Sequence, residues 1–128
     1  MLDPLIAPLR AQLQSLLDAP RLRIQQVLAS RPAAAVVSGV YAISVPDRPE
    51  QVVYIGRTKT KTMLGRLQDH CRLATPSDLR GMLSRHAAYP QDPQCYDVRW
   101  TRVDEDVSRA QLELFAIAVV KPPFNRYI

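Results

Sequence analysis

Apolar residues recur every three or four positions through the first thirty residues, with polar residues between them. This spacing places the apolar side chains on one side of a helix. A proline inside a helix removes a backbone hydrogen bond, so Pro20 interrupts the pattern. We therefore expect one or two amphipathic helices in residues 4–29, broken near Ala19 and Pro20, and then a linker over residues 30–39. The apolar positions are Leu5, Leu9, Leu13, Leu16, Leu17, Ile24, Val27 and Leu28.

The pattern changes after the linker to short runs rich in β-branched and aromatic residues. GVYAISV (Gly39–Val45) and QVVYIG (Gln51–Gly56) flank the turn sequence PDRPE, which predicts an antiparallel hairpin. QCYDVRWTRV, residues 94–103, alternates apolar and polar positions well enough to predict a third strand.

Three further segments have helical spacing. We expect helices over residues 62–73, capped by Thr60 or Thr62, over residues 75–86, capped by Ser77, and over residues 106–121, ended by two prolines. The predicted fold is α/β of the α+β kind: a small three-stranded, mainly antiparallel sheet flanked by helices, with an N-terminal helical extension.

Length and composition are those of one ordinary globular domain, with 128 residues, 47% hydrophobic and 23% charged. No apolar run approaches the roughly 18 residues that a membrane helix needs. The N-terminus carries an acid and two prolines rather than a secretory signal. We expect a soluble, cytoplasmic protein without membrane association. The two cysteines and two histidines lack the paired spacing of a zinc site, which favours buried or half-buried thiols.

Positive charge is concentrated in one segment. Residues 57–85 contain seven cations and two acids, which accounts for the whole net charge of +5. Such an excess suits a polyanion such as nucleic acid, although a solvated helix face would have the same composition.

Six motif elements follow one another in this chain: GVY at residues 39–41, YIG at residues 54–56, Arg66 and His70 four positions apart, Glu113, and Asn125. In this order and spacing they resemble the GIY-YIG nuclease superfamily. The resemblance covers about residues 38–125, with a somewhat longer loop between Gly56 and Arg66. It divides the chain into a nuclease domain, 38–128, and an amphipathic helical extension, 1–37.

The resemblance implies a Mg²⁺-dependent endonuclease, with Mn²⁺ able to substitute, that hydrolyses DNA. The implied catalytic residues are Tyr41, Tyr54, Arg66, His70 and Glu113, with Glu113 as the metal ligand. Gly56, Arg57, Lys59, Lys61 and Asn125 are the implied supporting and substrate-binding residues. RNA is not excluded as a substrate, and the biological setting, whether DNA repair, restriction or a mobile element, stays open.

Glu113 and Arg66 each have a possible catalytic role and a possible role that is only structural. One carboxylate, Glu113, suits a hydrated Mg²⁺, which takes few protein ligands; the alternative is a surface ion pair with Arg109 one turn earlier. Arg66 suits a bidentate grip on phosphate; the alternative is a solvated helix cation. Arg66 and His70 lie one helical turn apart and therefore share a face.

The aromatic and small residues complete the expected site. Tyr41 is similar to the family's general-base or base-positioning tyrosine, which requires a cation or His70 nearby because a free phenol has a pKa near 10. We expect Tyr54 and His70 to complete its hydrogen-bond network, with His70 accepting its proton. Gly56 would let a phosphate approach the backbone. Asn125 would orient neighbouring groups, or simply turn the chain after the prolines.

Two rival functions stand beside the nuclease: a catalytically inactive nucleic-acid-binding module with the same fold, and a protein unrelated to nucleic acid. No helix-turn-helix or zinc-finger pattern is present, which favours a structure-selective or weakly sequence-specific enzyme. The N-terminal segment is expected to cap the sheet, although residues 1–30 also suit a homodimer contact or a protein partner.

Overall fold

The computed structural model describes residue 4 and residues 6–127. The helices are α1 (Ile6–Leu17), α2 (Ile24–Ser30), α3 (Met63–Arg72), α4 (Leu79–Ser84) and α5 (Asp106–Val120), joined by the short 3₁₀ helices η1 (Ala33–Ala35), η2 (Pro93–Cys95) and η3 (Pro123–Tyr127). The strands are β1 (Leu22–Arg23), β2 (Gly39–Val45), β3 (Arg48–Arg57) and β4 (Asp97–Arg102). The predicted helices and strands are therefore present, and the predicted break in the N-terminal helical segment is confirmed.

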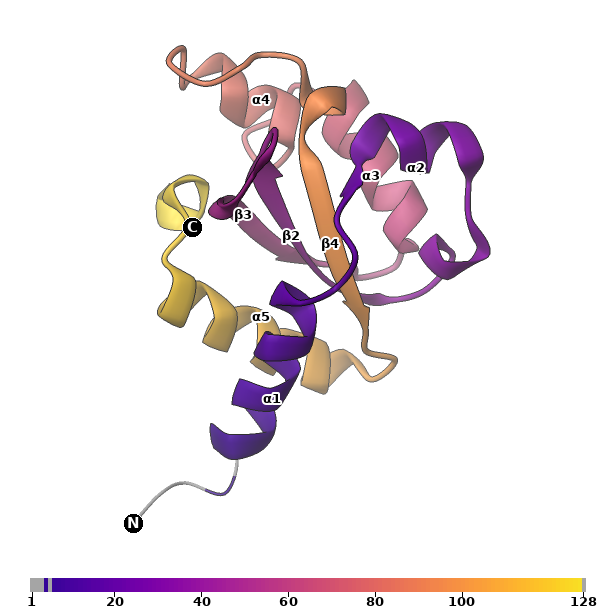
Figure 1. The fold of residues 1–128 in the computed structure, drawn as a ribbon, viewed down its shortest axis with the longest axis vertical. Coiled ribbons are helices and arrows are strands. Elements are labelled where there is room, and N and C mark those ends of the chain that lie inside the picture. The colour runs from indigo at the N-terminus through magenta and orange to yellow at the C-terminus, as the bar shows by residue number, and fades with distance from the viewer. Residues whose placement is uncertain (1–3, 5, 128) are drawn as a thin grey trace.

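The sheet is antiparallel with the strand order β1-β4-β2-β3, which makes this an α+β fold (Figure 1). It has one strand more than the sequence predicted. The additional strand, β1, is two residues long and pairs Leu22 with Val98 and Arg23 with Asp97. Two residues are too few to show an alternating pattern, so only the pairing with β4 reveals this strand.

The hairpin between β2 and β3 is tighter than PDRPE suggested. The turn consists of Pro46 and Asp47, and β3 begins at Arg48. Asp47 has φ 62°, a left-handed conformation that Asp tolerates better than most residues. Pro49 fits within β3 because β3 is an edge strand, so its missing N–H need not pair with a neighbouring strand.

Helices cover both faces of the sheet (Figure 1). On one face, Leu13 and Leu16 of α1 pack with Leu112 and Ala116 of α5 over the even-numbered side chains of β2. On the other face, side chains of α2, α3 and α4 pack over its odd-numbered ones, which include Tyr41. Because β2 is central and covered twice, every one of its residues is buried.

Arg99 of β4 joins α1 to the hairpin. Its guanidinium donates to the carbonyl oxygens of Leu17, at 2.7 Å, and Pro49, at 2.8 Å, and to the hydroxyl of Ser44 at 3.1 Å. Burial lowers the pKa of Arg99. With the buried leucines of α1, these bonds agree with the expectation that the N-terminal segment caps the sheet.

The ends of the helices confirm one predicted cap and correct another. Thr62 caps α3, its hydroxyl accepting the N–H of Gly65 at 3.2 Å. Ser77 does not cap α4: the N-cap position is Asp78, and its carboxylate makes no capping hydrogen bond. Helix α5 ends as expected just before the two prolines: its last residue is Val120, and the C-cap residue Lys121 is in the left-handed conformation.

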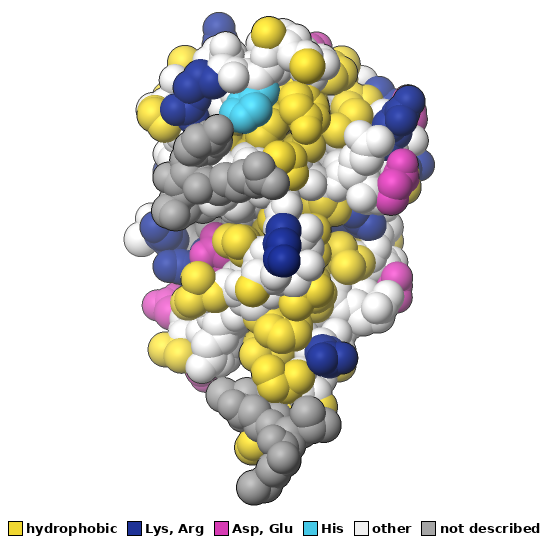
Figure 2. All heavy atoms as spheres, turned by 90° about the vertical axis from the view of Figure 1, so that its left-hand side faces the viewer, with side chains coloured by type: hydrophobic (Ala, Val, Ile, Leu, Met, Phe, Trp, Pro, Cys, Tyr) yellow, Lys and Arg dark blue, Asp and Glu magenta, His cyan; other side chains and the backbone are white. Residues whose placement is uncertain are grey.

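Apolar side chains gather in a band down the face shown in Figure 2. Of the large apolar side chains that are exposed among the described residues, Val107, Leu114 and Val119 lie on α5, whereas only Leu22 falls within residues 1–30. A partner contact through residues 1–30 stays a prediction.

No helix in the described part of the chain has the length and apolar composition needed to cross a bilayer.

Asn125 fastens η3 to the free edge of the sheet. Its Oδ1 accepts the N–H of Ile55 at 2.9 Å, and its Nδ2 donates to the carbonyl oxygen of Ile55 at 2.8 Å. Asn125 is buried, so these two bonds satisfy backbone groups of β3 that water does not reach.

Replacing Asn125 with alanine should lower the free energy of unfolding by about 2–4 kcal/mol, because two buried backbone groups lose their partner. Asn125→Asp should be worse at neutral pH, where the second carboxylate oxygen faces the Ile55 carbonyl. Acid should partly restore this variant, because a protonated Asp can donate there. Urea denaturation at neutral and acidic pH measures both effects; a neutral-pH Asn125→Asp protein as stable as the wild type would refute this role.

Candidate active site

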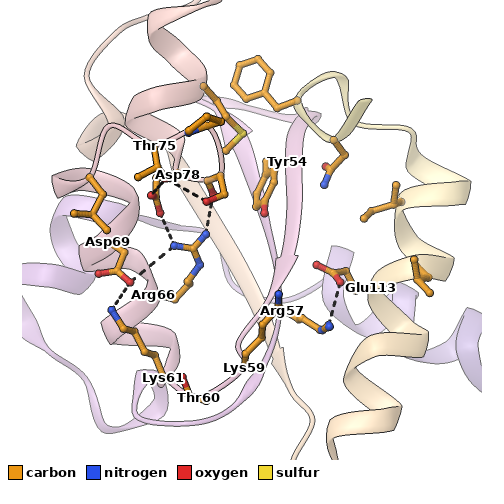
Figure 3. A pocket seen from close by; sticks show the side chains of 18 of the residues that line it. Tyr54, Arg57, Lys59, Thr60, Lys61, Arg66, Asp69, Thr75, Asp78 and Glu113 are labelled. Carbon is orange, nitrogen blue, oxygen red and sulfur yellow. Dashed lines mark hydrogen bonds and ion pairs between the residues drawn. The ribbon is translucent and has the colours of Figure 1, made fainter. Parts of the chain in front are cut away.

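The main pocket has a volume of about 1080 Å³ and opens where β3 ends, between the α3–α4 segment and α5. In Figure 3, Arg66 and Asp78 lie on one wall and Glu113 on the opposite wall, with Tyr54 between them. Most of the predicted site residues line this pocket: Tyr54, Arg57, Lys59, Lys61, Arg66, Glu113 and Asn125. Tyr41, Gly56 and His70 lie behind it and are buried.

Tyr41, Tyr54 and His70 form a cluster between the sheet and α3. The ring centroids of the two tyrosines are 6.1 Å apart, and each lies 5.5 Å from the His70 ring. The tyrosines are diagonal rather than directly paired, because Tyr41 lies opposite Gly56 and Tyr54 lies opposite Ile43. Both side chains still occupy the same face of the hairpin.

Gly56 is required by this packing. A Cβ at position 56 would lie 2.5 Å from the hydroxyl oxygen of Tyr41 and 2.8 Å from Cε2 of Tyr54. Its φ is not positive, so backbone strain does not explain the glycine. The structure gives a reason of its own: the tyrosine rings need the space that a side chain would fill. The approach of a phosphate to this backbone stays a prediction.

The backbone fixes the protonation of His70. The N–H of Leu79 donates to His70 Nδ1 at 2.8 Å, so Nδ1 carries no proton. Burial and the nearby charge of Arg66 lower the pKa of His70 well below its usual value, which leaves the ring neutral. The ring proton is therefore on Nε2, which donates to the Tyr41 hydroxyl at 2.7 Å. The expectation that His70 accepts the proton of Tyr41 is wrong in this arrangement.

Both phenols are protonated at neutral pH. Burial raises the pKa of Tyr41 well above 10, and Arg66 opposes this only in part. Burial also raises the pKa of Tyr54, again against Arg66. The two tyrosines differ in access: Tyr54 is 8% exposed and lines the pocket, whereas Tyr41 is 0% exposed. Tyr54 is thus the phenol that a molecule in the pocket can meet.

Arg66 reaches from α3 into the pocket and is held by the segment before α4. Its Nη1 donates to Asp78 Oδ1 at 2.5 Å and its Nη2 to the carbonyl oxygen of Ser77 at 2.8 Å. Burial lowers the pKa of Arg66, but Tyr41 and Asp78 more than offset it, so the guanidinium stays charged. Arg66 is therefore a fixed cation rather than a freely solvated one.

Glu113 projects from α5 into the pocket and faces Arg57. The distance from its Oε1 to Arg57 Nη1 is 3.5 Å. Burial raises the pKa of Glu113, and the charges of Arg57 and Lys59 oppose the shift. The alternative pairing with Arg109 is wrong, because the buried Arg109 binds Asp106 and the carbonyl oxygens of Thr58, Val103 and Asp104.

The donor set fits a Mg²⁺ ion held by one carboxylate. Of the three acids lining the pocket, Asp69 is bound by Lys61 at 2.5 Å and Asp78 by Arg66. The ion-pair distance from Glu113 to Arg57 is longer, at 3.5 Å, and the half-buried charge of Glu113 would gain from a cation. No group of three or more His, Cys, Asp or Glu side chains suited to a metal occurs in the described region. A Mg²⁺ ion that keeps most of its water ligands needs few protein ligands, so Glu113 alone could hold it.

The cations after Gly56 differ in their availability. Lys61 is paired with Asp69, and Arg57 is in contact with Glu113, whereas Lys59 is exposed beside the pocket.

The sequence did not predict Asp69, Asp78 and Arg85 as site residues, although they also line the pocket. An aspartate before a helix is normally read as a cap, so the sequence carries no signal that Asp78 binds Arg66 instead.

Comparisons with known proteins find a similarity in structure but none in sequence. No protein-family model matches the sequence, and no curated protein matches it. The structure is similar to the crystal structure of the GIY-YIG N-terminal endonuclease domain of UvrC from Thermotoga maritima, bound to its catalytic divalent cation, magnesium. The TM-score is 0.49 with 18% sequence identity, over 92% of this chain and 96% of that chain.

Proposed function

We propose that this protein is a metal-dependent endonuclease that hydrolyses phosphodiester bonds of DNA. The observation that carries the proposal is the pocket in which Arg66, Tyr54 and Glu113 come together beside exposed Lys59. Each of these groups meets one need of the reaction, and they come from three separate elements and the loop after β3. The order of motifs along the chain supports the same function independently.

Charge in the pocket suits a phosphodiester. The lining contains five cations, Arg57, Lys59, Lys61, Arg66 and Arg85, and three acids. Arg66 would hold the scissile phosphate, because its guanidinium is fixed in place before substrate binds. A pre-positioned cation stabilises the charge that develops on the phosphate without having to reorganise during the reaction.

The attacking water would meet the hydroxyl of Tyr54. This phenol lines the pocket, and Arg66 lowers its pKa against the effect of burial. Tyr41 would act from behind, held by His70 and packed against Tyr54, and would keep the phenol and Arg66 in place. In this proposal the base-positioning role moves from Tyr41, where the resemblance puts it, to Tyr54.

Glu113 is the residue that would hold Mg²⁺. When bound there, the ion would supply positive charge to the phosphate and to the leaving oxygen. Glu113 lies on the wall opposite Arg66, so positive charge would act on the phosphate from two sides (Figure 3). Arg57 would release the carboxylate and become available for a neighbouring phosphate.

We also propose that the substrate is DNA rather than RNA and that the enzyme recognises DNA structure or has weak sequence specificity. The proposal divides the chain in two. Residues 38–128 would form the nuclease domain. Residues 1–37 would form an extension whose first helix covers the sheet face opposite His70. Neither helix of that extension contributes a residue to the main pocket.

Glu113→Gln should lower metal-dependent cleavage by at least about a hundredfold, because the neutral amide is a poor Mg²⁺ ligand. Its melting temperature should not fall, since burial already disfavours the charged carboxylate. Labelled plasmid, single-strand, duplex, flap and RNA substrates with Mg²⁺ or Mn²⁺, and with EDTA as blank, measure activity. Glu50→Gln, which removes an exposed acid outside the pocket, is the matched control. Full activity of Glu113→Gln would remove Glu113 from the mechanism.

Acid should switch the reaction off at a higher pH than an ordinary glutamate would. Burial raises the pKa of Glu113 above 4.5, so its carboxylate gains a proton, and loses metal, earlier as the pH falls. The stability of the fold changes in the opposite direction. Because burial favours the protonated form of Glu113, the free energy of unfolding falls as the pH rises through this pKa. A ¹³C-NMR titration of the metal-free protein measures the value, and a pKa at or below 4.5 would contradict the buried environment.

Lys59→Ala should weaken DNA binding and reduce the slope of log affinity against log salt concentration by about one, because one phosphate contact is lost. Arg10→Ala on the outer side of α1 should leave the slope unchanged. Fluorescence anisotropy over a salt series measures both. Salt-sensitive binding by a wild-type protein that cleaves nothing would instead favour the inactive binding module.

A further inference from the structure

Asp78 stands at the beginning of α4 but does not cap it. At an N-cap, an aspartate normally accepts an N–H from the first turn of its own helix. Here the carboxylate makes no such bond, although the residue is 2% exposed. A nearly buried charge that gives up its local hydrogen bond must be compensated elsewhere, since an unpaired buried charge is costly.

The compensation comes from Arg66 and Thr75. Asp78 Oδ1 accepts Nη1 of Arg66 at 2.5 Å, and its Oδ2 accepts the hydroxyl of Thr75. The preceding residue, Ser77, contributes its carbonyl oxygen to Nη2 of Arg66. Two adjacent residues thus hold the two terminal nitrogens of the same guanidinium, which fixes both its position and its plane.

The same segment holds the second member of the Arg66–His70 pair. Leu79, directly after Asp78, donates its N–H to His70 Nδ1. The segment is folded tightly against α4, because the N–H of Asp78 bonds the Thr75 carbonyl and a Cβ at Gly81 would lie 1.9 Å from that oxygen. Three consecutive residues, 77–79, therefore contact both motif residues of α3.

We propose that Asp78 is a positioning residue that orients Arg66 toward the scissile phosphate, with residues 77–79 acting as one clamp on Arg66 and His70. The proposal rests on the proposed nuclease function. Asp78 acts through Arg66 and need not touch the substrate. Its carboxylate accepts from one terminal nitrogen of the guanidinium, and Arg66 lines the pocket with 19% of its side chain exposed.

Two other roles for Asp78 make different forecasts. If it competed with phosphate for Arg66, its removal would increase activity. If it only stabilised the start of α4, its removal would lower stability and would act independently of Arg66. If Asp78 positions Arg66, its removal should lower kcat, and only when Arg66 is present.

The first test is a double-mutant cycle with Asp78→Asn, Arg66→Ala and the combined variant, measured by steady-state cleavage over a range of substrate concentrations. Asp78→Asn should lower kcat by about tenfold to a hundredfold with little change in KM, because a displaced guanidinium costs rate more than binding. In the Arg66→Ala background it should have no further effect. Asp104→Asn, an exposed aspartate paired with Arg102, is the matched control. A faster Asp78→Asn enzyme, or effects that multiply independently, would overturn the proposal.

The second test does not depend on cleavage. ¹⁵N-NMR of the Arg66 guanidinium should show separate, slowly exchanging Nη signals in the wild type, and Asp78→Asn should average them. Adding a nuclease-resistant phosphorothioate oligonucleotide should shift the Arg66 signals less in Asp78→Asn than in the wild type. Identical Arg66 spectra in the two proteins would refute the role of Asp78 whether or not cleavage occurs. Absence of metal-dependent cleavage by the wild type alone would instead refute the nuclease function.

Discussion

The hydrogen bond between Tyr41 and His70 joins the central strand of the sheet to the helix that carries Arg66, and the geometry of the pocket depends on it. Three conditions must hold together for this bond to form. Gly56 must lack a side chain because a Cβ there would collide with the end of the Tyr41 side chain. The Leu79 N–H must keep His70 Nδ1 free of a proton, so that Nε2 donates. The bond must also be shielded from water, and both residues are 0% exposed.

Charge balance in the pocket explains why so many cations can lie close together. Asp69 and Asp78 each neutralise one cation, Lys61 and Arg66, and hold it in a defined place. Glu113 is left with a weaker contact to Arg57 and with a pKa raised by burial. The pocket therefore combines fixed positive charge on one wall with a carboxylate on the other that would gain most from a further cation. This asymmetry matches the needs of phosphodiester hydrolysis, where negative charge grows on the phosphate as the bond breaks.

Much of this arrangement could be predicted from the sequence, and the exceptions have physical reasons. Strand β2 and helix α5 were readable because their patterns are long and stop at clear signals, Pro46 after the strand and two prolines after the helix. Strand β1 was not, since two residues have no period. The grouping of Tyr54, Arg66 and Glu113 followed from the motifs, but the protonation of His70 depends on a backbone N–H nine residues away, which no side-chain pattern reveals. Asp78 was hidden for a similar reason: its local signal is that of a helix cap, and a tertiary contact overrides it.

The bidentate contact of Asn125 with Ile55 has a consequence beyond the site. Strand β3 is an edge strand of the sheet, and an open edge offers its unpaired backbone groups to any other extended chain. Asn125 occupies the N–H and the C=O of Ile55, and Pro49 has no N–H to offer. One side-chain amide and one proline thus remove backbone groups of β3 with which an added strand could pair. If the protein cuts DNA as proposed, this contact would limit strand pairing between copies at the end of β3 that borders the pocket.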